Sequence, residues 1–395
     1  MTCLQMEINR MHARHLLIVL MALLLNSGCG VQDMFKGKDN TVPPAPLTEI
    51  QSQIQVNKLW SNNVGKGPDK QYVNLVPSIS GQHIFTASRD GVVTAMDAKT
   101  GRQKWRTDTK ARLAGGPGTG DGLVLVGSSD GEVIALSEAD GKQVWKARVT
   151  SEVLSVPSAA AGVSVVRTTD GRLFGLSSET GNRLWNYDRT VPVLTLRGSS
   201  SPVLIGGLVI CGFESGKISA LSLKNGRPYW EKSVTFPTGR SELERIVDID
   251  GDPLVINGII YASSYQGRVV AIELETSKTL WARDLSSFTG MAADIDHLYV
   301  TDDNGYVWAL DRRSGSSLWK QDKLFNRQVT APVSIGDYVV VGDFEGYLHW
   351  LSKEDGHFVA RTRADSAGIN SNPIVSDDIL YSYGQSGELT AMSIR

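Results

Sequence analysis

The residues that could carry out chemistry in this chain are few and widely scattered. Beyond residue 29 there are four histidines, His83, His297, His349 and His357, and they do not have the spacing of zinc ligands. The glycine-rich stretch 115–122 does not fit a phosphate-binding loop and is typical of turns. These patterns predict no catalytic residues and no cofactor.

Two other features contain residue types that occur in reactive or metal-binding sites. The acidic run Asp248-Ile249-Asp250-Gly251-Asp252 lacks the spacing and the distal glutamate of a calcium-binding EF-hand loop. Cys211 ends the strand-like segment 208–211, which favours a small buried side chain over a reactive thiol. We therefore predict no metal site. The net charge of −2 gives no electrostatic reason to expect nucleic acid as a partner.

A repeat accounts for most of the chain. One phrase, Gly-x-apolar-x-Ala-Leu-x-x-x-x-Gly-x-x-x-Trp, runs from Gly91 to Trp105 and recurs with substitutions. The other copies begin at Gly131, Gly171, Gly216, Gly267, Gly305, Gly346 and Gly387. A proline stands fourteen residues before every leading glycine except Gly305. A tryptophan stands fourteen residues after the first six, and Ala360 takes its place in the Gly346 copy.

Each repeat predicts four short antiparallel strands joined by tight glycine turns, the pattern of a β-propeller blade. Proline cannot donate to a sheet, so its fixed position suits the innermost strand, whose edge is free. The segment Val56–Trp60 matches a fourth strand and would complete the truncated last copy. We predict an all-β, eight-bladed propeller closed by N- and C-terminal strands in one blade, with seven blades as the alternative.

The phrase from Ala95 to Trp105 resembles the blade motif of quinoprotein alcohol dehydrogenases, which are also eight-bladed. This resemblance implies an alternative function, that of a periplasmic dehydrogenase dependent on pyrroloquinoline quinone. Such enzymes carry vicinal cysteines, carboxylates on a calcium ion and large insertions. Here Cys211 is the only cysteine after residue 29, and the connections between repeats are short. The preferred prediction is therefore a protein that is not an enzyme.

The N-terminus predicts export and lipid attachment. Arg10 and Arg14 precede an apolar run from 16 to 25, which is too short to span a bilayer and is typical of a secretory signal. Gly28-Cys29 resembles the lipobox of bacterial lipoproteins, although Asn26 stands where a leucine is usual. The alternative is a plain cleaved signal. We predict a signal peptide over 1–28, a lipidated Cys29 with a flexible tether over 29–53, and a propeller over 54–395.

Two adjacent connections between repeats are long. Most take 10 to 13 residues from tryptophan to proline, whereas Trp185 to Pro202 takes 17 and Trp230 to Pro253 takes 23. Insertions in a repeat protein map to loops, which often bind partners. Leucines and an arginine beside carboxylates have the composition of a protein-binding hot spot. The alternative is that Leu194 and Leu196 only cover a blade edge.

These two loops resemble those of the outer-membrane assembly factor family BamB. The similarity includes Leu194-Thr195-Leu196-Arg197-Gly198, the Glu-Arg-x-x-Asp-x-Asp loop ending at Asp250, and the stretch 342–350. It implies a non-catalytic lipoprotein on the periplasmic face of the outer membrane, held there by its lipid anchor. The implied partners are the POTRA domains of BamA and the other β-barrel assembly components. The implied docking residues are Leu194, Leu196, Arg197, Asp248 and Asp250. Binding of unfolded outer-membrane protein clients at a blade edge is a further hypothesis.

The predicted anchor can be tested by replacing Cys29 with alanine. Labelled fatty acid should enter the wild-type protein, whereas Cys29→Ala should remain unlabelled and leave the membrane fraction. The physical reason is that each buried methylene of an acyl chain contributes about 0.8 kcal/mol to membrane binding. A Cys29→Ala protein that stays on membranes would show that lipid is not the attachment.

Overall fold

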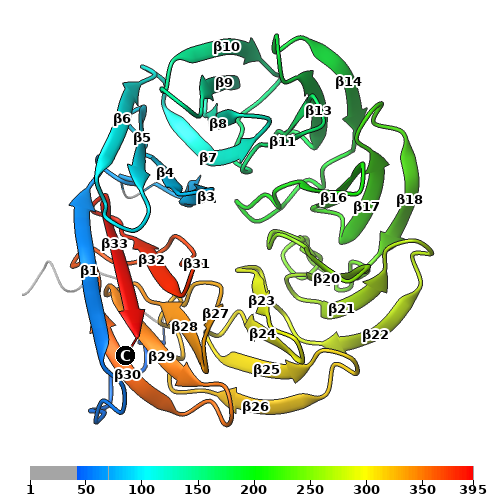
Figure 1. The fold of residues 1–395 in the computed structure, drawn as a ribbon. Coiled ribbons are helices and arrows are strands. Elements are labelled where there is room, and N and C mark those ends of the chain that lie inside the picture. The colour runs from blue at the N-terminus through cyan, green and yellow to red at the C-terminus, as the bar shows by residue number, and fades with distance from the viewer. Residues whose placement is uncertain (1–41, 70, 395) are drawn as a thin grey trace, which may run out of the picture. The chain divides into compact units, whose positions relative to one another are not determined.

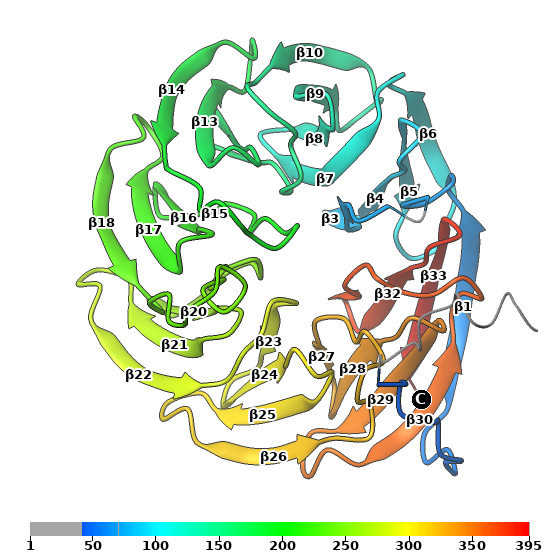
Figure 2. The same ribbon diagram turned by 180° about the vertical axis from the view of Figure 1, so that it is seen from behind.

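The computed structural model describes residues 42–69 and 71–394, so the predicted signal peptide and Cys29 lie outside the described residues. Residues from Pro44 onward form one compact unit. Its regular elements in the described ranges are all strands, which form eight sheets arranged in a ring (Figures 1 and 2). No helix of the described residues is long and apolar enough to cross a membrane. The eight-bladed all-β propeller predicted from the sequence is confirmed.

Each blade is an antiparallel meander. Its strands follow one another in order from the centre of the ring to the outside. The strands of blades 1 to 3 are β3 (Ser78–Ser80), β4 (His83–Ala87), β5 (Val92–Asp97) and β6 (Gln103–Asp108); β7 (Leu113–Gly120), β8 (Leu123–Ser128), β9 (Glu132–Ser137) and β10 (Gln143–Arg148); and β11 (Ser158–Ala160), β12 (Val163–Arg167), β13 (Arg172–Ser177) and β14 (Arg183–Asp188). Blades 4 and 5 are β15 (Val203–Ile205), β16 (Leu208–Gly212), β17 (Lys217–Ser222) and β18 (Pro228–Ser233); and β19 (Leu254–Ile256), β20 (Ile259–Ser263), β21 (Arg268–Glu273) and β22 (Thr279–Asp284).

The remaining blades follow the same order. Blades 6 and 7 are β23 (Met291–Ala293), β24 (His297–Thr301), β25 (Val307–Asp311) and β26 (Ser317–Gln321); and β27 (Val333–Ile335), β28 (Tyr338–Gly342), β29 (Tyr347–Ser352) and β30 (Phe358–Arg363). Blade 8 is β31 (Ile374–Ser376), β32 (Ile379–Tyr383), β33 (Glu388–Ile394) and β1 (Val56–Asn63). Blade 2 departs from the predicted four strands, because the short β2 (Asn74–Leu75) adds to β7 in parallel at Gly115 and Gly116.

The pairing of β1 with β33 closes the ring as predicted. Val56 lies opposite Ile394 and Asn63 lies opposite Glu388, so the first and last strands form one antiparallel ladder. The repeated prolines also lie where expected. Six of them directly precede the innermost strand of a blade, and Pro117 lies within β7. At these positions the missing N–H removes no hydrogen bond between neighbouring strands.

The repeated tryptophan is the main contact between neighbouring blades. In seven of the eight junctions its indole N–H donates to a backbone carbonyl in the turn between the third and fourth strands of the next blade, at 2.7–3.0 Å. The ring packs on the turn's glycine so closely that a Cβ there would lie 2.5–2.7 Å from the indole at Gly101, Gly141, Gly181, Gly226, Gly315 and Gly356. The repeat thus joins the tryptophan of one blade to the glycine of the next.

The eighth junction explains the missing tryptophan. The third and fourth strands of blade 8 come from opposite ends of the chain, so no turn joins them and no glycine is present to receive an indole. Blade 7 correspondingly has Ala360 at the tryptophan position. Ile54 and Val56 pack against the cluster that contains buried Ala360 and Trp350.

Residues 45–54, which we call the strap, lie against blade 7. The amide of Ala45 donates to the carbonyl of Phe325, and the amide of Gln53 donates to the carbonyl of Val359 in β30. Ile50 packs against the cluster at the junction of blades 6 and 7. The sequence assigns most of this segment to the tether, since it has no repeat of its own, whereas the compact unit already begins at Pro44.

The tryptophan–glycine contact predicts a position-specific cost of adding a methyl group. Gly141 and Gly122 both have positive φ, +71° and +74°, but only a Cβ at Gly141 would meet Trp105. Gly122→Ala should cost about 1–2 kcal/mol of unfolding free energy from backbone strain alone. Gly141→Ala should cost about 1–3 kcal/mol more because the indole must move. Chemical denaturation measures both; equal losses would refute the packing role.

Candidate functional site

The two long connections emerge on the same face of the ring. In an antiparallel meander the turns alternate between the two faces, so all blade-to-blade connections share one face with the turns after the second strands. We call this the connection face. It carries residues 189–202, between β14 and β15, and residues 234–253, between β18 and β19. These loops bring together the five predicted docking residues.

The first loop presents apolar side chains and one cation to solvent. Val193 is 96% exposed and Leu194 is 38% exposed, whereas Leu196 is partly buried. The exposed guanidinium of Arg197 lies 3.0 Å from the Glu152 carboxylate, and its Nε donates to the carbonyl of Tyr72 at 3.4 Å. These two contacts orient the guanidinium toward Glu152 and Tyr72.

The two aspartates have a different place from the one expected. Asp248 is fully buried and accepts the backbone N–H of Leu196 at 2.5 Å. The carboxyl group of Asp250 packs against Gly198, where a Cβ would lie only 2.2 Å from the carboxyl carbon. The expectation of an exposed acidic rim is thus not met at Asp248, because its carboxylate is needed to bind the backbone of the first loop. Both aspartates support the loop from beneath.

The acidic run acts as a unit in this support. Asp252 Oδ1 accepts the backbone N–H of Ser201 at 2.5 Å, so alternate carboxylates contact the first loop at positions 196, 198 and 201. Alternation in an extended segment turns every second side chain to the same side. This arrangement explains the Asp-x-Asp-x-Asp spacing without a metal. In the described residues, no three His, Cys, Asp or Glu side chains are grouped to hold a metal ion.

A buried ion pair lies behind the aspartates. Arg167 is fully buried, contacts Glu214 at 2.6 Å and donates to the carbonyl of Ser200 at 3.0 Å. Cys211 is also fully buried, as the sequence predicts, and burial raises the pKa of its thiol to about 11. A thiol in this state is a poor nucleophile at neutral pH.

Burial also governs the ionisation of the aspartates. It raises the pKa of Asp248 to about 7, an effect that the Leu196 N–H opposes and nearby Glu214 reinforces. Burial and then the charge of Asp248 raise the pKa of Asp250 well above its usual value. One oxygen of each carboxyl group, Oδ1, is buried without a hydrogen-bond partner. The loop support therefore includes one group, Asp248, whose charge changes near neutral pH.

The connection face carries more apolar surface than the sequence analysis singled out. Tyr72, Phe236 and Leu243 are 59–70% exposed and lie in blade-to-blade connections. Phe236 and Leu243 belong to the longer of the two loops, so its length was a signal, but its exposed side chains were not identified. Exposed apolar side chains of this size are typical of protein-binding surfaces.

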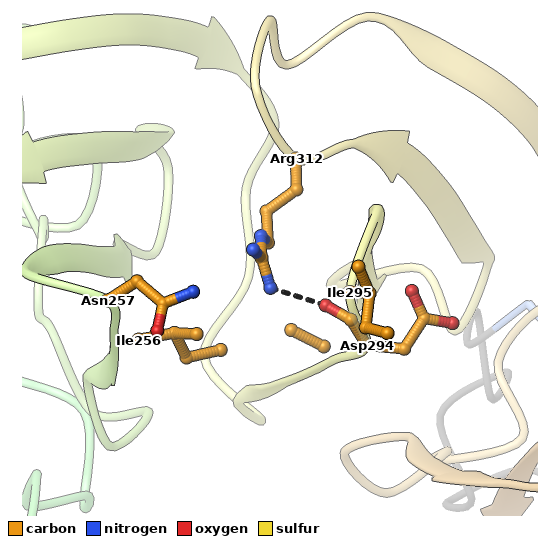
Figure 3. Close-up of a pocket in the computed structure, with 6 residues that line it drawn as sticks. Ile256, Asn257, Asp294, Ile295 and Arg312 are labelled. Atoms are coloured by element: carbon orange, nitrogen blue, oxygen red, sulfur yellow. Dashed lines mark hydrogen bonds between the residues drawn. The ribbon is translucent and has the colours of Figure 1, made fainter.

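Two further polar features lie among the described residues. Ser129 lies in a Gly-x-Ser-x-Gly sequence over 127–131, which the prediction of no catalytic residues overlooked. It occupies the turn between β8 and β9, and its hydroxyl donates to Glu152 at 2.8 Å rather than to a histidine. A depression of about 370 Å³ on the opposite face is lined by Ile256, Asn257, Ala293, Asp294, Ile295 and Arg312 (Figure 3). Arg312 there donates to the Asp294 backbone carbonyl, 2.5 Å away.

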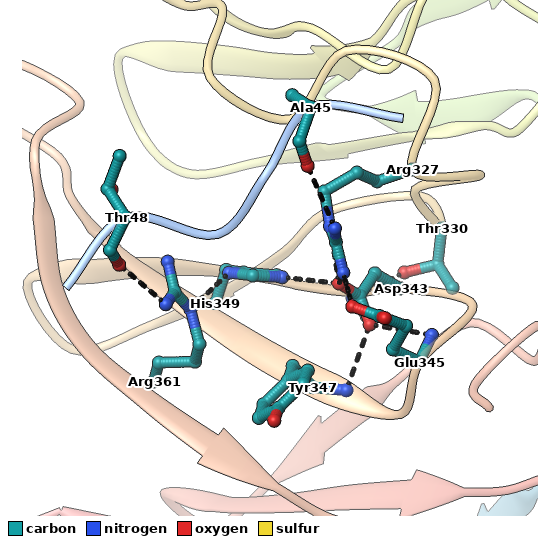
Figure 4. A network of polar contacts seen from close by, with 10 residues as sticks. Ala45, Thr48, Arg327, Thr330, Asp343, Glu345, Tyr347, His349 and Arg361 are labelled. Carbon is teal, nitrogen blue, oxygen red and sulfur yellow. Dashed lines mark hydrogen bonds and ion pairs between the residues drawn. The ribbon is translucent and has the colours of Figure 1, made fainter. Parts of the chain in front are cut away.

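The stretch 342–350 forms a buried polar network (Figure 4). His349 is fully buried, with Nε2 2.9 Å from Asp343, and its Nδ1 accepts from Arg361 Nε at 3.2 Å. Burial lowers the pKa of His349, which favours the neutral ring. Arg327 and Arg361 donate to the strap carbonyls of Ala45 and Thr48 at 2.9 and 2.8 Å. The network therefore holds the strap on blade 7.

The geometry defines a class of protein: a β-propeller scaffold whose distinctive surface is a loop-built face with exposed apolar side chains. A family profile described as the outer membrane protein assembly factor BamB matches residues 89–321. The assembly factor BamB of Pseudomonas aeruginosa is 50% identical over 95% of this chain and 98% of its own length. That of Escherichia coli K12 is 34% identical over 97% of this chain and 100% of its own. The chain belongs to the BamB family.

Solved structures agree with this assignment. BamB from Moraxella catarrhalis matches 86% of this chain and 100% of its own with a TM-score of 0.78 and 28% identity. A quinohemoprotein alcohol dehydrogenase from Comamonas testosteroni matches 85% of this chain and 76% of its own with a TM-score of 0.66 and 14% identity. The second likeness shows a shared propeller fold and nothing of the chemistry.

The raised pKa of Asp248 predicts a pH-dependent stability. The folded protein holds this proton more tightly than the unfolded chain, whose carboxyl ionises near 3.8. Its stabilising contribution is therefore present below about pH 4 and is lost as the pH rises to about 7. Asp248→Asn keeps an oxygen for the Leu196 amide but cannot ionise. The melting temperature of Asp248→Asn minus that of wild type should therefore increase as the pH is raised from 5 to 8.

The matched control is Asp284→Asn, which changes an aspartate whose side chain is 88% exposed. Its melting temperature should differ from wild type by a similar amount at each pH. If Asp248→Asn also gave a constant difference, the buried carboxylate would not be the titrating group.

Proposed function

We propose that the protein is a non-catalytic scaffold of the outer-membrane β-barrel assembly complex, anchored through Cys29 on the periplasmic face of the outer membrane. Support comes from relatives that are named outer membrane protein assembly factors and that are similar to this chain over nearly their whole length. It also comes from the described residues of the connection face, which offer exposed apolar groups and the cation Arg197. The observation that carries the proposal is the first loop, which is contacted by three carboxylates of the second loop, of which that of Asp248 is fully buried.

The POTRA domains of BamA are the proposed partner of this loop. Leu194 and Arg197 would contact the partner directly, with Leu196 at the boundary between surface and core. Asp248 and Asp250 would act by holding the loop in its binding conformation. A pre-formed loop loses little conformational entropy on binding, so its few side chains can contribute more of their contact energy. Unfolded outer-membrane protein clients are proposed as a second, transient class of partner.

The quinoprotein alternative has less support. Its basis is the shared propeller fold at 14% identity, and a fold of this kind serves many functions. The only described cysteine is buried Cys211, so no vicinal pair is available there to hold the quinone as the resemblance implies.

The docking proposal predicts a separation of binding from stability. Replacing Leu194 and Arg197 with alanine should weaken binding to BamA by about 2 kcal/mol or more, because both are proposed hot-spot side chains. Their partial or full exposure should keep the change in unfolding free energy within about 0.5 kcal/mol. Arg197→Glu should be worse than Arg197→Ala, since a carboxylate adds repulsion. Co-purification with BamA and a thermal melt measure the two effects.

Leu318→Ala provides the control, because Leu318 is 51% exposed but lies on β26 at the outside of the ring. It should leave BamA binding unchanged. BamA binding that survives in the Leu194, Leu196 and Arg197 triple alanine variant would move the interface to another part of the ring. If the melting temperature falls and BamA binding is lost as well, these residues would instead belong to the core.

A further inference from the structure

A third connection between blades is as long as the first loop. Trp60 to Pro77 takes 17 residues, the same number as Trp185 to Pro202. This connection joins β1 of blade 8 to β3 of blade 1, so it lies on the connection face with the other two loops. We call residues 64–77 the third loop. Extra length on this face is therefore present in three places.

Both ends of the third loop are bound to the ring. Near its start, the carbonyl of Gly67 accepts the backbone N–H of Arg89 at 2.9 Å. Near its end, Asn74 and Leu75 form β2, which pairs with β7, and Leu75 is buried. Tyr72 lies between these two attachments and is 59% exposed. A loop attached at both ends has less freedom to lose when it binds a partner, which lowers the entropic cost of binding.

The third loop contacts the first loop at Arg197. The Nε of Arg197 donates to the backbone carbonyl of Tyr72 at 3.4 Å. Burial raises the pKa of the Tyr72 phenol, the charge of Asp250 adds to this rise, and the charge of Arg197 opposes it. Charges act in this way on a group only from nearby, so the hydroxyl end of Tyr72 is close to both groups while the rest of the ring is open to solvent. An aromatic ring and a guanidinium from two different loops thus share one surface.

A chain of polar contacts orients Arg197 on this surface. Its Nη2 lies 3.0 Å from the Glu152 carboxylate, which accepts the hydroxyl of Ser129 at 2.8 Å. The Ser129 hydroxyl in turn accepts from the Arg89 guanidinium at 2.8 Å. Arg89 is also the residue whose backbone N–H binds the third loop. Arg197 is thereby directed toward the side of the connection face over which the third loop passes.

We propose that Tyr72 is a further partner-binding residue, and that the docking surface for the POTRA domains extends from the first loop onto the third loop. This inference rests on the proposed function, since it adds a residue to the same docking site. The partner surface that fits is an apolar side chain, packed on the exposed part of the tyrosine ring, beside a carboxylate that pairs with Arg197. Tyrosine and arginine are among the residue types that contribute most to binding at protein interfaces.

The binding test measures the Kd between the complete mature protein and detergent-solubilised BamA. Tyr72→Ala keeps the backbone carbonyl that binds Arg197 and removes only the ring, so it should weaken binding at least about tenfold. Its melting temperature should stay within about 1 °C of wild type, because an exposed loop side chain contributes little to stability. Tyr72→Phe should bind within about threefold of wild type, since it retains the contact area of the ring.

The matched control is Tyr229→Ala, because Tyr229 is 68% exposed but lies on β18 at the outside of the ring. It should leave the Kd unchanged. A second measurement does not depend on affinity. The photocrosslinking amino acid p-benzoylphenylalanine in place of Tyr72 should form a crosslink to BamA in intact cells, and the same amino acid in place of Tyr229 should form none.

A double variant separates contact with the partner from positioning of Arg197. If Tyr72 acted only by holding Arg197, adding Tyr72→Ala to Arg197→Ala would cause no further loss of binding. Direct contact predicts a further loss of at least about threefold in the double variant.

The proposal is overturned if Tyr72→Ala binds BamA as wild type does, or if the double variant binds as Arg197→Ala does. If the melting temperature of Tyr72→Ala falls, the crosslink at position 72 decides, and its absence overturns the proposal. Arg197→Glu distinguishes this failure from that of the docking site. Loss of BamA in Arg197→Glu but not in Tyr72→Ala would refute only the extension onto the third loop, whereas retention of BamA in both would refute the docking proposal as well.

Discussion

The fit between one blade's tryptophan and the next blade's glycine turn is the constraint on which the ring depends. The indole both fills the junction and satisfies a backbone carbonyl, so one residue type supplies apolar burial and a hydrogen bond together. The turn must have glycine or another residue with positive φ, as at Ser277, where φ is +58°. Ala360 stands where no such turn exists, which shows that the requirement is on the pair rather than on either residue.

A scaffold fixed by these junctions leaves its connections free to vary. The loop 189–202 is one such variable connection. Its backbone is nevertheless held in place, because Asp248 and Asp252 of a second loop accept hydrogen bonds from it. The energetic cost is the burial of carboxyl groups beside a single cation, Arg167. Placing the carboxylates inside leaves the outer surface of the loop to apolar side chains and Arg197. The support of the loop and the composition of its exposed surface thus come from different residues.

The sequence predicted the architecture well because the repeat states it eight times. Glycine, proline and tryptophan at fixed offsets identify turns, inner strands and junctions, and the match of Val56–Trp60 to a fourth strand identified the closure. The role of Asp248 could not be predicted, because the local sequence around a loop aspartate does not indicate whether the side chain faces solvent or a backbone amide. The extra strand β2 follows from the approach of two chain segments at glycines, and no periodicity records such an approach.

The closure of blade 8 determines which step of folding comes last. Ser61 and Glu388, which meet across β1 and β33, are 327 positions apart in the chain. The strand that is synthesised first must wait for the strand that is synthesised last, and the entropy of closing so long a loop must be met by that final pairing. Until then every earlier blade can form, but the ring stays open at one seam. Loss of a few C-terminal residues would therefore damage the first strand of the protein as much as the last.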